Sequence, residues 1–99
     1  MALQVNWSPL AQDKRKSILA FWIENNGDHS YSLKFNSLFK EATTQLSKFP
    51  YIGRPSDIPG VRIKIVRDYL LFYEDTKFTI EILTIWDSRQ DPTNLKIDS

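Results

Sequence analysis

Three apolar runs in the second half of the chain constrain the fold more than any other feature. Over residues 61–65, aliphatic residues alternate with Arg62 and Lys64, which is the period of a β-strand. Residues 69–73 are apolar at successive positions, as in a strand covered on both faces, and a longer apolar run occupies residues 78–85. Short polar turns separate the runs, so the sequence predicts a three-stranded antiparallel meander.

The first half of the chain predicts one strand and two helices. Apolar residues alternate over residues 3–7, and Ser8 with Pro9 supplies an N-cap and a first helical position. The helix is expected to end at the Asn25-Asn26-Gly27 signal, and a second helix to end before Pro50. The second helix carries an apolar stripe at three- and four-residue steps, formed by Phe35, Leu38, Phe39, Ala42, Leu46 and Phe49.

These elements define an α+β class for one domain over residues 1–99. We expect the N-terminal strand, an antiparallel two-helix hairpin and the meander to form a four-stranded, largely antiparallel sheet with both helices on one face. Residues 90–99 contain Pro92 and few large side chains, and we expect a loosely packed tail there.

Composition excludes several kinds of site. The chain has no cysteine and one histidine, His29, so disulfides, thiolate metal sites, multi-histidine metal sites and histidine triads are unavailable. We expect no metal and no cofactor. The N-terminus lacks a secretion signal and no apolar run reaches transmembrane length, so the expected location is the cytoplasm without membrane contact.

The charged residues are sorted along the chain although the net charge is only +1. From residue 54 to residue 67 one acid, Asp57, stands among four bases: Arg54, Arg62, Lys64 and Arg67. Arg62 and Lys64 share a strand face, whereas Arg67 has the opposite parity and joins them only if the chain turns or bulges near Asp68. The alternative interpretation is an ordinary solvated strand face.

The basic residues suggest a surface that binds phosphate. Guanidinium groups bind phosphate bidentately, and Arg54 and Arg89 could converge with Arg62 and Lys64. Bases could stack on aromatic rings, for which the candidates are Tyr51, Tyr69, Tyr73 and Trp86. For each ring the alternative is packing in the core.

Cleavage of RNA would also need proton transfer. A 2′-hydroxyl must lose its proton and an arginine can stabilise the phosphate, so the base would be Asp87, Glu74, a tyrosine or Lys64. The polar segment 86–92 ends an apolar strand and could hold this chemistry. It could equally be a strand-end turn in which Asp87 pairs with Arg89 or caps the backbone.

Several short motifs occur in a characteristic order. They are W-S-P-x-A near the start, F-P-x-I-G-R-P after the second helix, V-R at the next strand, Y-x-x-x-Y in the strand after it, and I-L-T-I-W-D-S-R-Q-D-P at the end. Together they resemble the RelE/ParE toxins of type II toxin–antitoxin systems over roughly residues 3–92. The resemblance implies a compact α+β toxin neutralised by a cognate antitoxin that wraps its surface.

The resemblance also implies roles for individual residues. Arg62 matches the arginine that opens a strand, Tyr69 and Tyr73 the paired tyrosines, Arg89 the arginine after the last strand, and Arg54 a basic loop position. Many RNA-cleaving relatives carry histidine or tyrosine near the last arginine. The residues found there in this chain are Asp87, Ser88, Gln90 and Asp91.

Three functional hypotheses follow. The first is a RelE-like, metal-independent endonuclease that cuts mRNA on the ribosome, with Arg62, Arg89 and Asp87 as catalytic residues. In this hypothesis the nucleic-acid-binding residues are Arg54, Lys64, Arg67, Tyr69 and Tyr73. The alternative is a ParE-like inhibitor of DNA gyrase without nuclease activity, and the third is a protein that only pairs with its antitoxin. In each case we expect the antitoxin on an apolar or basic face opposite the helical hairpin; the oligomeric state stays open.

Overall fold

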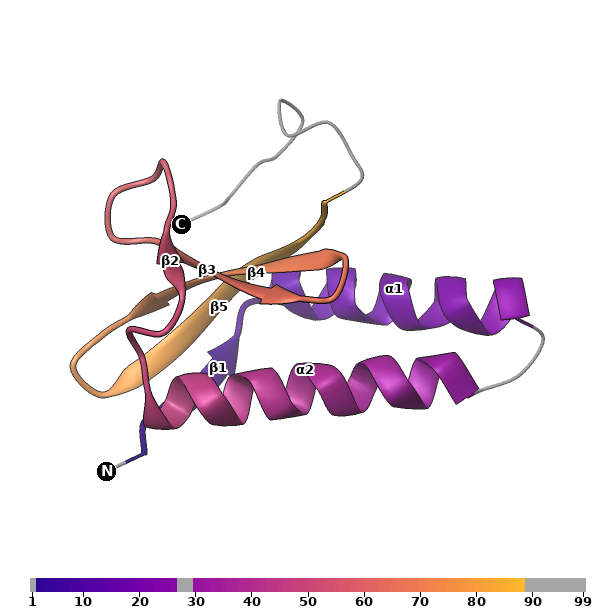
Figure 1. Ribbon diagram of the computed structural model, residues 1–99, viewed down its shortest axis with the longest axis horizontal. Helices are drawn as coiled ribbons and strands as arrows, with labels where there is room; N and C mark the ends of the chain where they lie inside the picture. Colours follow the sequence, from indigo (N-terminus) through magenta and orange to yellow (C-terminus); the bar gives the residue numbers. More distant parts are fainter. Residues whose placement is uncertain (1, 27–29, 89–99) are drawn as a thin grey trace.

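The fold is a β-sheet with two helices packed on one face, which confirms the α+β class (Figure 1). The computed structural model describes residues 2–26 and 30–88. The expected tail over residues 90–99 lies outside this range, as does the predicted link between the helices. The elements are β1 (Gln4–Trp7), α1 (Pro9–Asn26), α2 (Ser30–Lys48), β2 (Arg54–Pro55), β3 (Arg62–Val66), β4 (Tyr69–Asp75) and β5 (Thr79–Asp87).

Within the described residues, the sheet has five strands in the order β1-β5-β4-β3-β2. The predicted meander is present, because β3, β4 and β5 are antiparallel neighbours, and β1 adds to β5 in parallel. The expected number of four strands was wrong because β2 pairs with β3 over Arg54 and Pro55 alone. A strand of this length has no alternating pattern that sequence could reveal.

The start of α1 follows from the local sequence. The hydroxyl of Ser8 accepts a hydrogen bond from the backbone N–H of Ala11 at 3.0 Å, which is the predicted N-cap contact. The same hydroxyl donates to the carbonyl of Leu83 at 2.7 Å. The cap therefore also joins the first turn of α1 to β5. None of the helices in the described residues is long and apolar enough to cross a membrane.

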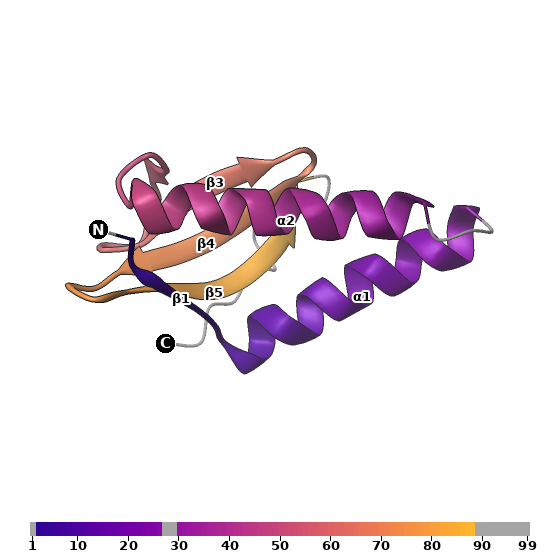
Figure 2. The same ribbon diagram turned by 90° about the horizontal axis from the view of Figure 1, so that it is seen from below.

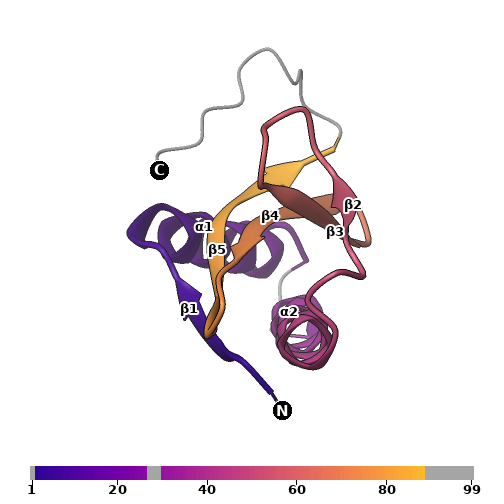
Figure 3. The same ribbon diagram turned by 90° about the vertical axis from the view of Figure 1, so that its left-hand side faces the viewer.

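The main core lies between the helices and the sheet. Figures 2 and 3 show α1 and α2 side by side on one side of the strands, while the loop between β2 and β3 lies on the other side. The predicted stripe of α2 is largely confirmed, except that Phe49 follows the end of the helix and is 61% exposed. The buried residues of this cluster are Ala11, Phe35, Phe39, Ala42, Leu46, Val66, Tyr69, Leu71, Tyr73, Ile80, Ile82 and Ile85.

A β-bulge in β5 sets which of its side chains enter this core. The register of β4 and β5 shifts between Phe72 and Tyr73, so that Leu83 has no directly opposed residue in β4. Ile82 and Ile85 consequently belong to the same cluster although their parities differ. A smaller cluster on the opposite face buries Val61, Phe72, Leu83 and Trp86.

Candidate functional site

The two basic residues of β3 share one face, and that face is the one that carries the helices. Arg62 is paired with Tyr73 and Lys64 with Leu71, and both partners belong to the helix-side core. Directly opposed residues in an antiparallel pair point to the same face. The predicted grouping of Arg62 with Lys64 is therefore confirmed, but the pair does not lie on the open face of the sheet.

Arg62 is held in place by the loop that follows α2. Its Nη1 donates a hydrogen bond to the carbonyl of Gly53 at 3.0 Å, and its guanidinium carbon lies 5.4 Å from the centre of the Tyr51 ring. The side chain of Tyr51 is 70% exposed. A delocalised cation therefore lies beside an exposed aromatic ring at the edge of the sheet.

The buried side chain of Tyr73, in β4, holds the same loop through the backbone of Pro50 and Gly53. Its hydroxyl donates to the carbonyl of Pro50 at 2.8 Å and accepts from the N–H of Gly53 at 3.0 Å. Burial raises the pKa of Tyr73 above its ordinary 10.0, against opposing effects of the Gly53 hydrogen bond and the Arg62 charge. The ring is fully buried, so the expectation that Tyr73 stacks on a base was wrong.

Tyr69 also belongs to the core. Its ring meets Phe35 and Phe39 edge to face, with centroid distances of 5.4 Å and 6.0 Å. The indole N–H of Trp22 donates to its hydroxyl at 2.9 Å. With 3% of its surface exposed, Tyr69 offers no ring face to a base, and the buried Trp86 offers none either. The alternative interpretation of these rings, packing in the core, is the correct one.

Arg54 points away from Arg62. It is paired with Ile63 across β2 and β3, whereas Arg62 is opposed to Pro55. Neighbouring residues of a strand point to opposite faces, so Arg54 lies on the face of Ile63. The expectation that Arg54 converges with Arg62 on one phosphate-binding surface was wrong for this reason.

Arg67 lies on the same side of the sheet as Lys64, as expected if the chain turned near Asp68. Arg67 and Asp68 form the tight connection between β3 and β4, and Arg67 has a positive φ of 58°. Lys64 and Arg67 line one shallow groove of roughly 180 Å³ between β3 and α2, together with Glu41. A carboxylate in the lining weakens the groove as a phosphate site.

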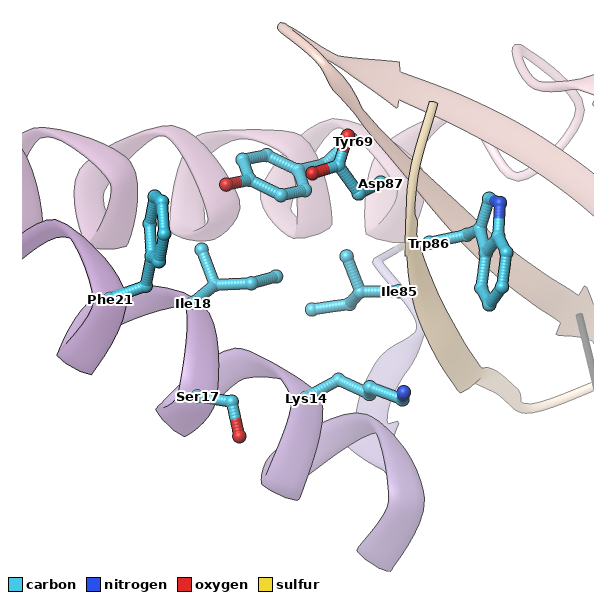
Figure 4. Close-up of a pocket in the computed structure, with 8 residues that line it drawn as sticks. All are labelled: Lys14, Ser17, Ile18, Phe21, Tyr69, Ile85, Trp86 and Asp87. Carbon is cyan, nitrogen blue, oxygen red and sulfur yellow. The ribbon is translucent and has the colours of Figure 1, made fainter. Parts of the chain in front are cut away.

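Asp87 lies in a different cleft, between α1 and the end of β5 (Figure 4). The cleft has a volume of roughly 240 Å³, and Lys14, Phe21 and Tyr69 contribute to its lining. Figure 4 shows the Asp87 carboxylate near the Tyr69 ring, while the Trp86 side chain points to the other side of β5. The third expected catalytic residue, Arg89, lies outside the described residues.

Arg62 and Asp87 are far apart in the sheet. Asp87 is paired with Tyr69 and Arg62 with Tyr73, at positions four residues apart along β4. Four residues of a strand span about 13 Å and two strand spacings about 10 Å, so the two Cα atoms are separated by roughly 16 Å. Arg62 is moreover held toward Gly53, on the β2 side. The two residues do not face one phosphate.

Sequence reasoning missed the role of Gly53. An added Cβ would lie 2.5 Å from the Tyr73 hydroxyl oxygen and 2.9 Å from the carbonyl oxygen of Ile63. Only glycine allows the loop to approach the sheet this closely. The usable signal was the glycine between two prolines, Pro50 and Pro55, in a loop followed by a tyrosine-bearing strand. Within the described residues, no group of three or more potential ligands is arranged to hold a metal ion.

Comparison with known proteins agrees with this architecture. The sequence profile of the ParE toxin of the type II toxin–antitoxin system parDE matches residues 5–92. Among solved structures, a chain of the chromosomal ParDE toxin–antitoxin system from P. aeruginosa superposes with a TM-score of 0.77 at 22% sequence identity. The alignment covers 87% of this chain and 96% of that one. None of the curated protein sequences matches this chain.

The family match over residues 5–92 and the shared fold identify a toxin of the RelE/ParE superfamily. Within that superfamily, the chain belongs to the ParE toxin family of type II toxin–antitoxin systems.

Proposed function

We propose that this toxin acts by binding and inhibiting DNA gyrase and that it does not cleave RNA. The observation that carries the proposal is the match of the ParE family profile to residues 5–92. The sequence hypotheses placed a ribosome-dependent nuclease first and the gyrase inhibitor second. The family match favours the second hypothesis, and the expected contacts with ribosome and mRNA find no support.

The positions of the candidate catalytic residues also support a binding toxin. Cleavage needs a base and a phosphate-stabilising group within hydrogen-bond reach of one substrate. Arg62 and Asp87 are separated by roughly 16 Å of sheet, and Tyr69 and Tyr73 are buried in the core. An inhibitor that acts by occupancy needs an exposed surface instead, and the exposed Tyr51 ring beside Arg62 is compatible with such a role.

The partners follow from this class of protein. We propose two: a cognate antitoxin that covers the toxin in the stored complex, and gyrase once the antitoxin is lost. Both interactions would occur in the cytoplasm, with residues 1–99 acting as one domain.

Controlled expression of the toxin without its antitoxin tests the proposal. Plasmid supercoiling and DNA synthesis should fail before bulk translation slows. Asp87→Asn should keep full toxicity, because the carboxylate has no role in proton transfer under this proposal. Early loss of translation with intact plasmid supercoiling, together with loss of toxicity in Asp87→Asn, would favour the nuclease instead.

A further inference from the structure

The segment from Lys48 to Arg54, called here the aromatic loop, exposes large apolar side chains next to one another. Phe49 is 61% exposed, Tyr51 70% and Ile52 47%. Isolated apolar residues on a surface are ordinary, whereas neighbouring ones usually mark a contact surface. Phe49 was expected in the buried stripe of α2, but the helix ends at Lys48 and leaves Phe49 outside the core.

The backbone of the aromatic loop is fixed. The Tyr73 hydroxyl forms hydrogen bonds with the carbonyl of Pro50 and the N–H of Gly53. Within the loop, the N–H of Ile52 donates to the carbonyl of Phe49 at 3.2 Å. Gly53 is buried and in close contact with Tyr73. The exposed side chains are therefore presented by an ordered backbone, which lowers the entropy lost when a partner binds.

Basic residues lie in and beside the aromatic loop, and one acid, Asp75 of β4, acts on Tyr73 beneath the loop and adds to the effect of burial in raising its pKa. Lys48 begins the loop and Arg62 lies over the Tyr51 ring. Arg54, at the end of the loop, lies on the opposite face from Arg62. The sequence contains no acidic residue between Glu41 and Asp57. A complementary segment would carry carboxylates next to large apolar side chains, so that the carboxylates meet the cations while Phe49, Tyr51 and Ile52 are covered.

We propose that the aromatic loop is the docking surface for an acidic, apolar segment of the cognate antitoxin. This inference rests on the proposed function, because it takes the protein to be a toxin stored with its antitoxin. The antitoxin is favoured over nucleic acid because Phe49 and Ile52 add apolar contact area that a phosphate backbone cannot use, whereas a protein segment can. It is also the partner that would keep these side chains from water in the stored state.

Binding of the full-length cognate antitoxin to purified toxin variants tests the docking surface. The double variant Phe49→Ala/Tyr51→Ala should raise the Kd of the complex by about 30-fold or more, as for the loss of a central contact cluster. Lys48→Glu should raise the Kd by about tenfold and more strongly at low salt, because it places a like charge beside Phe49 against the carboxylates. The matched control is Leu33→Ala, which removes a 67% exposed side chain at the opposite end of α2 and should leave the Kd unchanged within about twofold.

The outcomes separate this inference from the proposed function. A Kd for the double variant equal to that of the unmodified toxin, with an unchanged melting temperature, would overturn the docking surface. Binding of a single-stranded DNA oligonucleotide that is lost in the double variant, while antitoxin binding persists, would assign the loop to nucleic acid and also overturn it. A toxin that leaves gyrase supercoiling unaffected but loses antitoxin binding in the double variant would refute only the gyrase target.

Discussion

The two faces of the β-sheet bury their side chains to different extents. The face under α1 and α2 contributes to a core of buried residues that runs from Ala11 to Ile85, whereas the opposite face buries Val61, Phe72, Leu83 and Trp86. On that opposite face Ile65 remains 52% exposed. The helix-side face therefore carries most of the stability, and it also holds the tyrosine that fixes the aromatic loop.

This difference shows what an alternating strand can and cannot reveal. Alternation in β3 correctly separates Arg62 and Lys64 from Ile63 and Ile65. It does not say which set faces the helices, because that depends on the register with β4. The intuitive choice, aliphatic residues toward the helices, is wrong here. Arg62 and Lys64 are opposed to the helix-side residues Tyr73 and Leu71, whereas Ile65 lies on the other face and is 52% exposed.

The largest expected effect comes from removing a helix-side core residue. Phe39→Ala should lower the free energy of unfolding by about 3–5 kcal/mol, because the ring is fully buried and contacts Phe35 and Tyr69. Urea denaturation followed by circular dichroism measures this change. A loss below about 1 kcal/mol would mean that the helix-side face does not carry the stability assigned to it.

The next effect tests whether the aromatic loop is part of the helix-side layer. Gly53→Ala should cost about 3 kcal/mol, because the new methyl group meets the Tyr73 ring and the backbone oxygen of Ile63. Gly60→Asn is the matched control. Nothing in the described part of the chain lies within 4 Å of a Cβ at that position, and asparagine tolerates its positive φ, so the loss should stay below about 1 kcal/mol. Equal losses in the two variants would contradict the close approach at Gly53.

The hydroxyl of Tyr73 should contribute a smaller amount with a distinct pH dependence. Tyr73→Phe should cost about 2 kcal/mol, because the N–H of Gly53 loses its buried acceptor. The folded-state pKa of Tyr73 is raised above 10.0, so the unfolded chain ionises first. The stability that the neutral Tyr73 hydroxyl contributes is therefore fully present below pH 10.0. This contribution is lost as pH rises toward the folded-state pKa.

The difference between the unmodified protein and Tyr73→Phe should therefore shrink with alkaline pH. Urea midpoints measured on both proteins at neutral pH and above pH 10.0 give this difference directly. Tyr51→Phe serves as the control, because its hydroxyl belongs to an exposed side chain. A difference that stays constant with pH would contradict the buried, neutral hydroxyl.

The smallest effect is expected on the opposite face. Ile65→Ala should change the free energy of unfolding by less than about 1 kcal/mol, because the side chain is already half exposed. The same denaturation measurement applies. A loss comparable to that of Phe39→Ala would remove the contrast between the two faces.

Much of the fold could be predicted because its signals are local. The N-cap at Ser8, the stripe of α2 and the meander each rest on residue spacing within one element. The strand β2, the parallel addition of β1 and the bulge at Leu83 depend on contacts between distant segments. Sequence spacing carries little information about such pairings.

The candidate site was less predictable for a related reason. Residues were grouped by type, and tyrosines four positions apart were named as candidate stacking rings, with packing in the core as the alternative. Both Tyr69 and Tyr73 face the helices because they share the parity of Leu71 in a strand covered on both faces. The sequence analysis singled out Arg62 but not Gly53, whose carbonyl accepts a hydrogen bond from Arg62. The role of Gly53 depends on its contact with Tyr73, which is distant in the sequence.

The supercoiling activity of purified DNA gyrase in the presence of this toxin tests the central claim most directly. We predict that the toxin inhibits supercoiling in proportion to its concentration, that pre-bound antitoxin abolishes the inhibition, and that mRNA on programmed ribosomes stays intact. Unaffected supercoiling together with cleaved ribosome-bound mRNA would contradict the account.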